Sequence, residues 1–317
     1  MRFYSNLALR PNTVKTYASQ HRSFLGICMA CSVNPLTALT ENHLCLVVII
    51  YAKTHKITTV PGFVSALANF ASQHNHPPLP RNKLYERVMA GLNNFYGDTN
   101  VSVPRKALTL SDLCAFYAAI DHGSFSGARD WCACLFAFFG LLRINEYTNA
   151  GLQAQHVTHT QWGISLTIPF SKTQLHKSHV DIVRRGDELC PVRAHLRYRA
   201  LVPSALNTPE AAYFLASPST PTPLTDGDFI RRVRALVKST LKCDPALYAG
   251  HSFRRGGTTA LAMAGVPEAT IAAHGRWSSL AYRMYYDVQH LSSVRQMASA
   301  ALKVYTDKHP LPGLTQV

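Results

Sequence analysis

The sequence predicts a mainly α-helical protein with a small β-sheet, organised as an N-terminal helical domain and a C-terminal α+β domain. Apolar residues recur at helical spacing through most of the chain. Residues 157–170 differ, because β-branched residues are frequent there and apolar and polar residues partly alternate, as in a strand. A polar, glycine-containing stretch at 96–106 separates the two halves. The length of 317 residues suits two domains, and 47% hydrophobic residues suffice for a core in each.

The first domain is expected at residues 1–100 and should contain helices and no strand. Thr40 stands where it can cap the second helix, because its hydroxyl can accept a hydrogen bond from a first-turn N–H group. The linker to the second domain is placed at 101–106. The expected helices cover residues 13–31, 41–53, 60–73 and 84–95.

The second domain is expected at 107–309, followed by a tail at 310–317. Ser111 should cap its first helix, which ends near Ile120, and the strongly apolar run 128–142 should form a buried helix. The remaining prediction is a hairpin of strands at 157–170 and 178–183, and helices at 190–201, 226–241, 252–264, 267–273, 278–288 and 292–305.

The charge balance indicates a polyanionic partner. Lys and Arg number 32 against 17 for Asp and Glu, which gives a formal net charge of +15. Such an excess favours nucleic acid, because neutralising phosphates drives sequence-independent affinity, although a merely basic protein shares it. No apolar run approaches the roughly 20 residues of a membrane span, and the N-terminus lacks a signal-peptide pattern. We therefore expect neither membrane insertion nor secretion.

The eight cysteines predict reduced thiols in an intracellular protein. They are scattered, and most lie in apolar segments. Cys28 and Cys31 form a single Cys-x-x-Cys, but no second Cys or His pair stands at zinc spacing. No metal site is expected.

Several polar residues of the second half stand where phosphate chemistry could use them. Arg143 follows the buried helix, where a charge must be solvated, liganded or paired, with Glu146 as the ordinary partner. Lys172 lies where the predicted strand meets a turn, a position that is usually just solvated. His251 and Arg254 share one face of a helical turn.

Two tyrosines further along complete the set. Tyr285 and Tyr286 follow the sequence Gly-Arg-Trp at 275–277. A histidine, a permanently charged arginine and a tyrosine hydroxyl are what phosphoryl transfer to a protein side chain needs. Each residue taken singly has an ordinary structural explanation, so the indication of a site comes from their order and context.

In this order the residues resemble the tyrosine recombinase, or phage integrase, family. Leu-Arg-Ile-Asn-Glu at 142–146 resembles the box around the family's first arginine, and Ser-Lys-Thr at 171–173 resembles its strand lysine. Gly-His-Ser-Phe-Arg-Arg-Gly-Gly at 250–257 resembles its His-x-x-Arg box. The resemblance is specific over residues 135–290. It implies that the second domain is the catalytic one and that the N-terminal helices are the family's helical core-binding domain.

The closing box departs from the family's commonest pattern. Most members have Leu-Gly-His, and some have tryptophan in place of the histidine, whereas this chain has His-Gly-Arg-Trp at 274–277. In the preferred gapless alignment Arg276 takes the histidine's place and Tyr285 becomes the nucleophile. If Trp277 takes that place, the nucleophile is Tyr286, whose side chain points about 100° away on a helix. The Gly-Arg-Trp-x-Ser form resembles recombinases of eukaryotic DIRS- and Crypton-type mobile elements.

The resemblance implies that a tyrosine hydroxyl cleaves DNA, which leaves a 3′-phosphotyrosyl link and a free 5′-hydroxyl. Arg143 and Arg254 would bind the non-bridging oxygens through their planar guanidinium groups. His251 would take the tyrosine proton or donate to the phosphate, and Lys172 would protonate the leaving 5′-oxygen. The residue in the histidine's place, Arg276 or Trp277, would add a further contact. No cofactor and no metal are implied.

The implied partners are double-stranded DNA and further copies of the chain. The family acts as a tetramer on two DNA sites, and the predicted helix at 292–305 would dock on a neighbouring subunit. The implied location is nuclear if the source is eukaryotic and cytoplasmic otherwise.

Three other functions stay open at this point. They are a DNA-binding protein descended from a recombinase that no longer cleaves, a topoisomerase of the tyrosine type, and a basic helical adaptor. The complete set of Arg, Lys, His, Arg and Tyr argues against loss of cleavage, and its order favours a recombinase over a topoisomerase.

Overall fold

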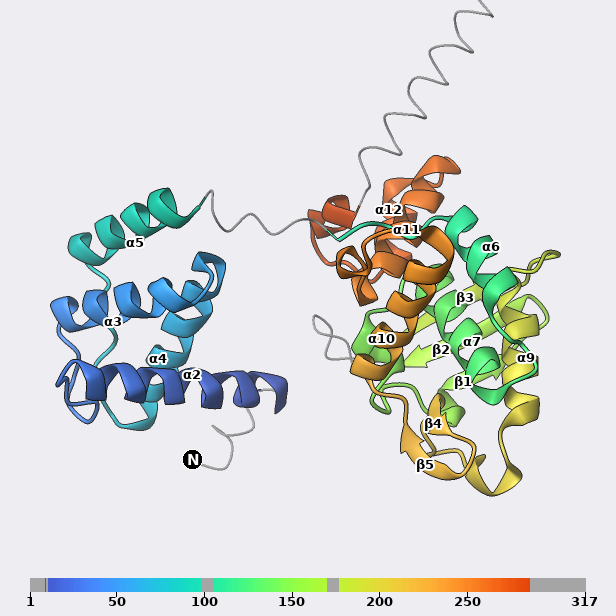
Figure 1. The fold of residues 1–317 in the computed structure, drawn as a ribbon, viewed down its shortest axis with the longest axis horizontal. Helices are drawn as coiled ribbons and strands as arrows, with labels where there is room; N and C mark the ends of the chain where they lie inside the picture. Colours follow the sequence, from blue (N-terminus) through green and yellow to red (C-terminus); the bar gives the residue numbers. More distant parts are fainter. Residues whose placement is uncertain (1–8, 10, 98–104, 170–176, 286–317) are drawn as a thin grey trace, which may run out of the picture. The chain divides into compact units, whose positions relative to one another are not determined.

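The chain divides into two compact units, Met1–Val103 and Pro104–Val317, each with its own hydrophobic core. The computed structural model describes residues 9, 11–97, 105–169 and 177–285. Both units are mainly helical, and the strands lie in the second (Figure 1). The predicted fold class is therefore confirmed.

Within its described residues, the first unit contains four helices and one short turn of 3-10 helix. Thr40 caps the second helix as predicted, because its hydroxyl accepts a hydrogen bond of 3.2 Å from the N–H of His43. All four predicted helices are present, and their ends differ from the prediction by no more than two residues. The elements are α2 (Pro11–Ala30), α3 (Glu41–Thr54), η1 (Ile57–Thr59), α4 (Val60–Gln73) and α5 (Lys83–Tyr96).

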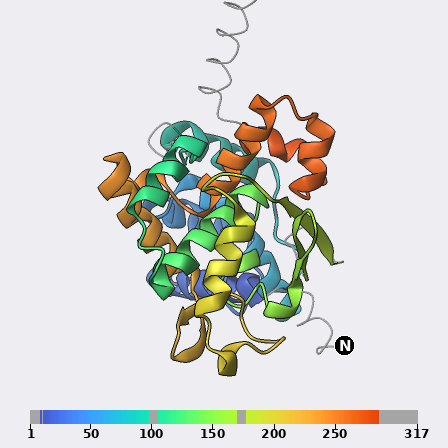
Figure 2. The same cartoon turned by 90° about the vertical axis from the view of Figure 1, so that its right-hand side faces the viewer.

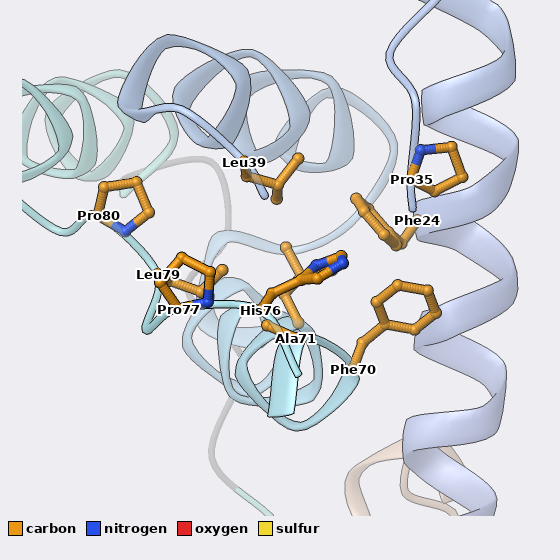
Figure 3. A pocket seen from close by; sticks show the side chains of 10 residues that line it. Phe24, Pro35, Leu39, Phe70, Ala71, His76, Pro77, Leu79 and Pro80 are labelled. Carbon is orange, nitrogen blue, oxygen red and sulfur yellow. The ribbon is translucent and has the colours of Figure 1, made fainter. Parts of the chain in front are cut away.

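A small pocket lies within this first unit, and its walls are mostly apolar. Figure 3 shows Phe24 of α2, Phe70 of α4 and Leu39 around it, with His76 as its polar side chain. Phe24 and Phe70 also meet edge to face, with ring centroids 5.2 Å apart. The pocket is thus a small gap among the core residues of the first unit, and none of the predicted site residues lines it.

The second unit begins with α6 (Leu110–Ala119), and the predicted cap at Ser111 is wrong. Thr109 is the cap, because its hydroxyl accepts from the N–H of Asp112 at 3.1 Å. The Asp112 carboxylate accepts in return from the N–H of Thr109 at 2.8 Å. This reciprocal pair satisfies two N–H groups at once, which Ser111 cannot do from inside the first turn.

The buried helix of the second unit is α7 (Phe125–Phe139), which begins and ends earlier than predicted. Ser124 caps its start by accepting from the N–H of Gly127 at 3.1 Å. Its end is set by Leu141, whose φ of 46° lies in the left-handed region and cannot continue the helix. The chain then enters the short helix α8 (Ile144–Tyr147).

The sheet has three antiparallel strands in the order β1 (Val157–His159), β2 (Gly163–Ile168) and β3 (Ser178–Val183). The predicted pairing of the second and third strands is confirmed, with Leu166 opposite Val180. The predicted single strand at 157–170 is wrong, because Thr160 and Gly163 exchange backbone hydrogen bonds that close a tight turn within it. A second, two-stranded sheet of β4 (Leu215–Ser217) and β5 (Thr220–Pro223) was not predicted.

The remaining helices follow the predicted order. The expected helix at 226–241 is α10 (Asp226–Leu236) continued by a π-helical turn, and the expected helix at 278–288 is described as a 3-10 helix as far as residue 285. The predicted helix at 292–305 lies outside the described residues. The elements are η3 (Ala154–His156), α9 (Pro191–Leu201), η4 (Ser204–Leu206), α10, η5 (Val237–Leu241), η6 (Pro245–Leu247), α11 (Gly250–Met263), α12 (Glu268–His274) and η7 (Leu280–Tyr285).

Helix α7 lies at the centre of the second unit and packs against both α9 and α11. The contact with α11 is close, because a Cβ atom at Gly257 would overlap the carbonyl oxygen of Phe138 in α7. Figures 1 and 2 show α12 and η7 at the opposite end of this unit from the β4–β5 hairpin. Among the described helices, none combines the length and apolar character needed to cross a membrane.

Candidate active site

Four short segments of the second unit meet at one place. They are the turn from α7 into α8, the first turns of α11, the turn after α12, and η7. The close packing of α11 on α7 places the start of α11 beside the end of α7. This packing brings together side chains that are far apart in the sequence.

Arg254 of α11 is fully buried at the centre of this place, with 0% of its surface exposed. Its Nη1 donates to the carbonyl oxygen of Leu141, and its Nη2 donates to that of Gly275 at 2.5 Å. The guanidinium is therefore held by backbone groups at its two Nη atoms, and its Nε is buried without a hydrogen-bond partner among the described residues.

Burial, together with repulsion from Arg143 and Arg276, lowers the pKa of Arg254 to about 9. A cation whose charge is disfavoured in this way gains from a bound anion, because the anion restores the lost interaction. The position therefore favours a phosphate ligand.

Arg143 lies at the start of α8 and pairs with Glu146. This is the ion pair expected from the sequence as the ordinary structural explanation for Arg143. Its Nη1 is 3.0 Å from one carboxylate oxygen of Glu146, and its backbone N–H donates to the other at 2.8 Å. The Arg143 side chain is 17% exposed, whereas that of Glu146 is 3% exposed. The pairing orients Arg143 and leaves other donors of its guanidinium open to a ligand.

Tyr285 and His251 face one another across η7 and α11. The phenol oxygen of Tyr285 is 3.3 Å from Nδ1 of His251, and the ring centroids are 5.8 Å apart. His251 is exposed and Tyr285 is partly exposed, so both can be reached from solvent. At this distance the histidine can take a proton from the phenol or hold it by a hydrogen bond.

Trp277 connects Arg254 to Tyr285. The Arg254 guanidinium lies 3.9 Å from the centroid of the Trp277 ring, and that ring is 5.2 Å from the ring of Tyr285. The attraction between a cation and an aromatic face stabilises this arrangement. Trp277 is therefore the residue of the Gly-Arg-Trp sequence that lies beside the tyrosine.

Arg276 lies differently, because its φ of 58° sends its side chain inward. It is 4% exposed, and its Nη2 donates to Glu146 at 2.7 Å. Its remaining bonds go to backbone oxygens of Gly140, Leu141 and His274. Its Nη groups are engaged with protein groups, and its Nε, like that of Arg254, has no hydrogen-bond partner among the described residues. Because its charge is paired with Glu146, the geometry does not favour the phosphate contact that the gapless alignment predicts for Arg276.

Lys172 and Tyr286 lie outside the described residues. Lys172 belongs to the segment that joins β2 to β3. The roles predicted for these two residues remain predictions.

The sequence reasoning treated Glu146 only as a partner for Arg143, and it gave no role to Leu141. In the structure Glu146 pairs with two arginines, and the Leu141 carbonyl accepts from both Arg254 and Arg276. The spacing of Glu146, three residues after Arg143, was the sequence signal for the pairing of Glu146. The backbone carbonyl of Leu141 leaves no signal in the sequence, because every residue has such a group.

From the sequence alone, four basic residues could either contact phosphate or form an ordinary solvated helix face: Arg231, Arg232, Arg234 and Lys238. Arg231 pairs with Asp228, Arg232 pairs with Asp130, and Arg234 donates to a backbone carbonyl. These partners favour the ordinary explanation. No group of three or more potential metal ligands occurs in the part of the chain that the structure describes.

The fold was compared with known proteins. No family model and no curated protein matches the chain. Among solved structures, the Tn1549 transposon integrase in complex with circular intermediate DNA aligns with a TM-score of 0.58 and 17% identity, covering 88% of this chain and 90% of that one. A lambda integrase tetramer bound to a Holliday junction aligns with a TM-score of 0.58 and 16% identity, covering 90% and 75%.

A third similar structure is the XerH site-specific recombinase bound to its palindromic difH substrate in a post-cleavage complex. It aligns with a TM-score of 0.57 and 16% identity, covering 83% of this chain and 72% of that one. At such identities the likeness is one of fold. The chain has the mainly helical fold with small antiparallel sheets that these integrases and recombinases share.

Proposed function

We propose that this protein is a site-specific DNA recombinase that cleaves and rejoins strands through Tyr285. The observation that carries the proposal is the Tyr285 hydroxyl 3.3 Å from Nδ1 of His251, with the Arg254 guanidinium 5.4 Å from the centroid of the Tyr285 ring. A nucleophile, a proton acceptor and a phosphate-binding cation are thereby in one place. The fold shared with DNA-bound integrases supports the same function.

In the proposed cleavage step the Tyr285 oxygen attacks the phosphorus atom, and the bond from phosphorus to the 5′-oxygen breaks. The phenol proton passes to His251, and Lys172 gives a proton to the leaving 5′-oxygen. The 3′-phosphotyrosyl link conserves the energy of the phosphodiester. A free 5′-hydroxyl can therefore reverse the attack and rejoin the strand without another energy source.

Arg143 and Arg254 are the proposed partners of the non-bridging oxygens. Fixed donors aimed at developing charge lower the barrier, and removing one such donor typically costs about 10²–10³ in rate. Trp277 would hold Arg254 in place and border the scissile phosphate. This assignment prefers Trp277 to Arg276 for the further contact and keeps Tyr285, rather than Tyr286, as the nucleophile.

The wider role that we propose is integration of a mobile element. The Gly-Arg-Trp-x-Ser sequence at 275–279 supports a relation to DIRS- and Crypton-type elements. The proposed partners are double-stranded DNA and three further copies of the chain, docked through residues 292–305. A DNA substrate implies a nuclear location in a eukaryote and a cytoplasmic one otherwise.

The alternatives make different use of the same site. A descendant that only binds DNA would keep the basic surface without needing Tyr285 beside His251. A tyrosine-type topoisomerase would relax supercoiled DNA without a preferred sequence. The three functions differ in whether the protein captures DNA covalently and in whether it prefers one DNA sequence.

A pool of random duplexes tests the proposal without knowledge of the target. Each duplex carries a nick on one strand, so that the short fragment released by cleavage diffuses away and the adduct accumulates. The protein is incubated with the pool without added metal, adducts are isolated under denaturing conditions, and their DNA is sequenced. Tyr285→Phe is the matched control, because it removes only the hydroxyl oxygen.

The expected result is a wild-type adduct enriched in one sequence, and no adduct with Tyr285→Phe. Binding to the pool without an adduct would contradict the proposal and favour the DNA-binding descendant. Adducts without sequence enrichment, together with relaxation of supercoiled plasmid, would favour the topoisomerase.

A further inference from the structure

Arg276 lies in the turn after α12, inside the protein rather than at the surface of the site. Its φ of 58° is in the left-handed region, which is unfavourable for a residue with a Cβ atom. The turn is held by backbone bonds of 3.0 Å from Arg276 to Ala273 and from Trp277 to Ala272. This conformation turns the Arg276 side chain inward and lets the next residue, Trp277, lie on Arg254.

The inward side chain of Arg276 is bound on several sides. Its Nη1 donates to the carbonyl oxygens of Gly140 at 3.3 Å and His274 at 3.1 Å. Its Nη2 donates to the carbonyl oxygen of Leu141 at 3.3 Å and to Glu146 at 2.7 Å. The guanidinium therefore joins the turn after α12 to the turn between α7 and α8.

Glu146 connects Arg276 to Arg143. One carboxylate oxygen accepts from Nη1 of Arg143 at 3.0 Å, and the other accepts from Arg276 at 2.7 Å and from the backbone N–H of Arg143 at 2.8 Å. The Glu146 side chain is 3% exposed, so water screens these interactions little. One carboxylate is thus shared by two cations.

We propose that Arg276 is a positioning residue, which holds Glu146 so that Arg143 presents its charge to the scissile phosphate. The inference rests on the proposed function. It assigns Arg276 an indirect role, whereas the alignment of the sequence assigns it a direct contact. The same guanidinium also fixes the Leu141 carbonyl to which Arg254 donates, so both phosphate-binding arginines depend on it.

Electrostatics gives the expected effect of losing Arg276. The full charge of Glu146 would then fall on Arg143 and compete with the phosphate for its guanidinium. The turn at Leu141 would also lose one of its two donors. A displacement of about 1 Å in a catalytic group can cost on the order of 100-fold in rate.

The test uses Arg276→Met, Glu146→Gln and the double variant in the full-length chain. Arg231→Met is the matched control, since Arg231 also pairs with a carboxylate, Asp228, and lies on α10, outside the four segments of the site. The rate of adduct formation is measured on nicked DNA of the captured sequence. Each rate is measured again on the same DNA with a methylphosphonate at the scissile position, which replaces a charged oxygen by a methyl group.

A positioning role predicts a loss of on the order of 100-fold for Arg276→Met on the phosphodiester. The rate on the methylphosphonate should fall much less, because its scissile group carries no negative charge for Arg143 to neutralise. The double variant should cleave faster than Arg276→Met alone, since removing the unpaired carboxylate frees Arg143. Arg231→Met should cleave at the wild-type rate.

Several outcomes would overturn the inference. Equal losses on the two substrates would indicate misfolding instead of positioning, and thermal unfolding of Arg276→Met would show it independently. A double variant as slow as Arg276→Met, or slower, would indicate that Arg276 contacts the phosphate directly. A wild-type protein that forms no adduct would overturn the proposed function, and with it this role.

Discussion

Arg254 carries the main electrostatic cost of the site, because its charge is buried with two other guanidinium groups nearby. Glu146 is the acidic partner that offsets this charge among the described residues of the site. An excess of positive charge remains, and a phosphate would neutralise it. The site is thus suited to binding an anion.

The lowered pKa of Arg254 predicts a pH dependence. In the free protein its guanidinium loses its proton as the pH rises through about 9, rather than near the ordinary value of 12.5. The initial rate of adduct formation at limiting DNA should therefore fall above pH 9. At saturating DNA the fall should move to higher pH, because bound phosphate favours the charged form.

Arg254→Lys is the variant that checks this assignment. A lysine has an ordinary pKa of about 10.4, so the same burial should move the fall in rate to lower pH. The lowered pKa of Arg254 affects the free energy of unfolding in the opposite sense, because stability should rise over the pH range in which the rate falls. Burial of the charged form destabilises the fold below pH 9, and this penalty is relieved as the pH rises toward 12.5. A rate that fell at the same pH in both proteins would contradict the role of Arg254.

At the residue scale, the sequence could predict the types of side chain but not all of their directions. The order of Arg143, His251, Arg254 and Tyr285 was readable because each stands in a recognisable context. The inward placement of Arg276 could not be predicted, because it depends on a left-handed φ angle that no neighbouring residue in the sequence indicates. Backbone carbonyls that bind the arginines leave no sequence signal.

At the scale of elements, the site depends on the close crossing of α11 and α7. Gly257 permits that crossing, because a Cβ atom there would meet the carbonyl oxygen of Phe138 in α7. At the neighbouring Gly256 a Cβ atom would meet the ring of Phe138 and the carbonyl oxygen of Leu108, which precedes α6. The beginning of α11 carries His251 and Arg254. Any separation of the two helices would therefore move both away from Arg143.

Gly256→Ala should destabilise the second unit by about 1–3 kcal/mol, as overpacked cores do, and should slow cleavage. Gly227→Ala in α10 is the matched control, since its nearest atom would lie 3.9 Å away and alanine favours a helix. Thermal unfolding of both variants measures the difference. An equal melting temperature for Gly256→Ala and wild type would show that the packing of α11 around Gly256 is looser than described.

The cap of α6 offers a second comparison within one helix. Thr109→Ala removes a hydroxyl that accepts at 3.1 Å from Asp112 and should cost about 1 kcal/mol of unfolding free energy. Ser111→Ala should change it by less than about 0.5 kcal/mol, because Ser111 is not the cap. Denaturant unfolding distinguishes the two. A larger cost at Ser111 would restore the cap that the sequence first indicated.

Elements with strong periodicity could be predicted, and those defined by turns could not. The helix at 60–73 shows its apolar face in the sequence, so its ends were predicted correctly. The β4–β5 hairpin contains two prolines in its second strand, and proline is normally depleted in strands. The break between β1 and β2 depends on a turn closed by Thr160 and Gly163, whose signal is weaker than the alternation around it.

At the scale of the whole molecule, two compact units share a net charge of +15. Each Lys or Arg that neutralises a DNA phosphate releases a bound counterion, which makes affinity depend on salt. The proposed function requires such contacts from the chain as a whole. It does not require them from Arg231 or Arg232, which have acidic partners.

Affinity for duplex DNA should therefore fall steeply with salt. With about six phosphates neutralised, the logarithm of the binding constant should fall with a slope near −5 against the logarithm of salt concentration. Fluorescence anisotropy of a labelled duplex measures the slope. Arg231→Gln should leave it nearly unchanged, and a slope near zero for the wild type would contradict binding through the DNA backbone.

The identity of the tyrosine that carries the DNA tests the central claim most directly. The adduct from the captured sequence is digested, and mass spectrometry locates the nucleotide on its peptide. We predict a 3′-phosphate on Tyr285, with the adduct retained in Tyr286→Phe and absent from Tyr285→Phe. A nucleotide on Tyr286, with the adduct lost only in Tyr286→Phe, would contradict the site described around His251, Arg254 and Trp277.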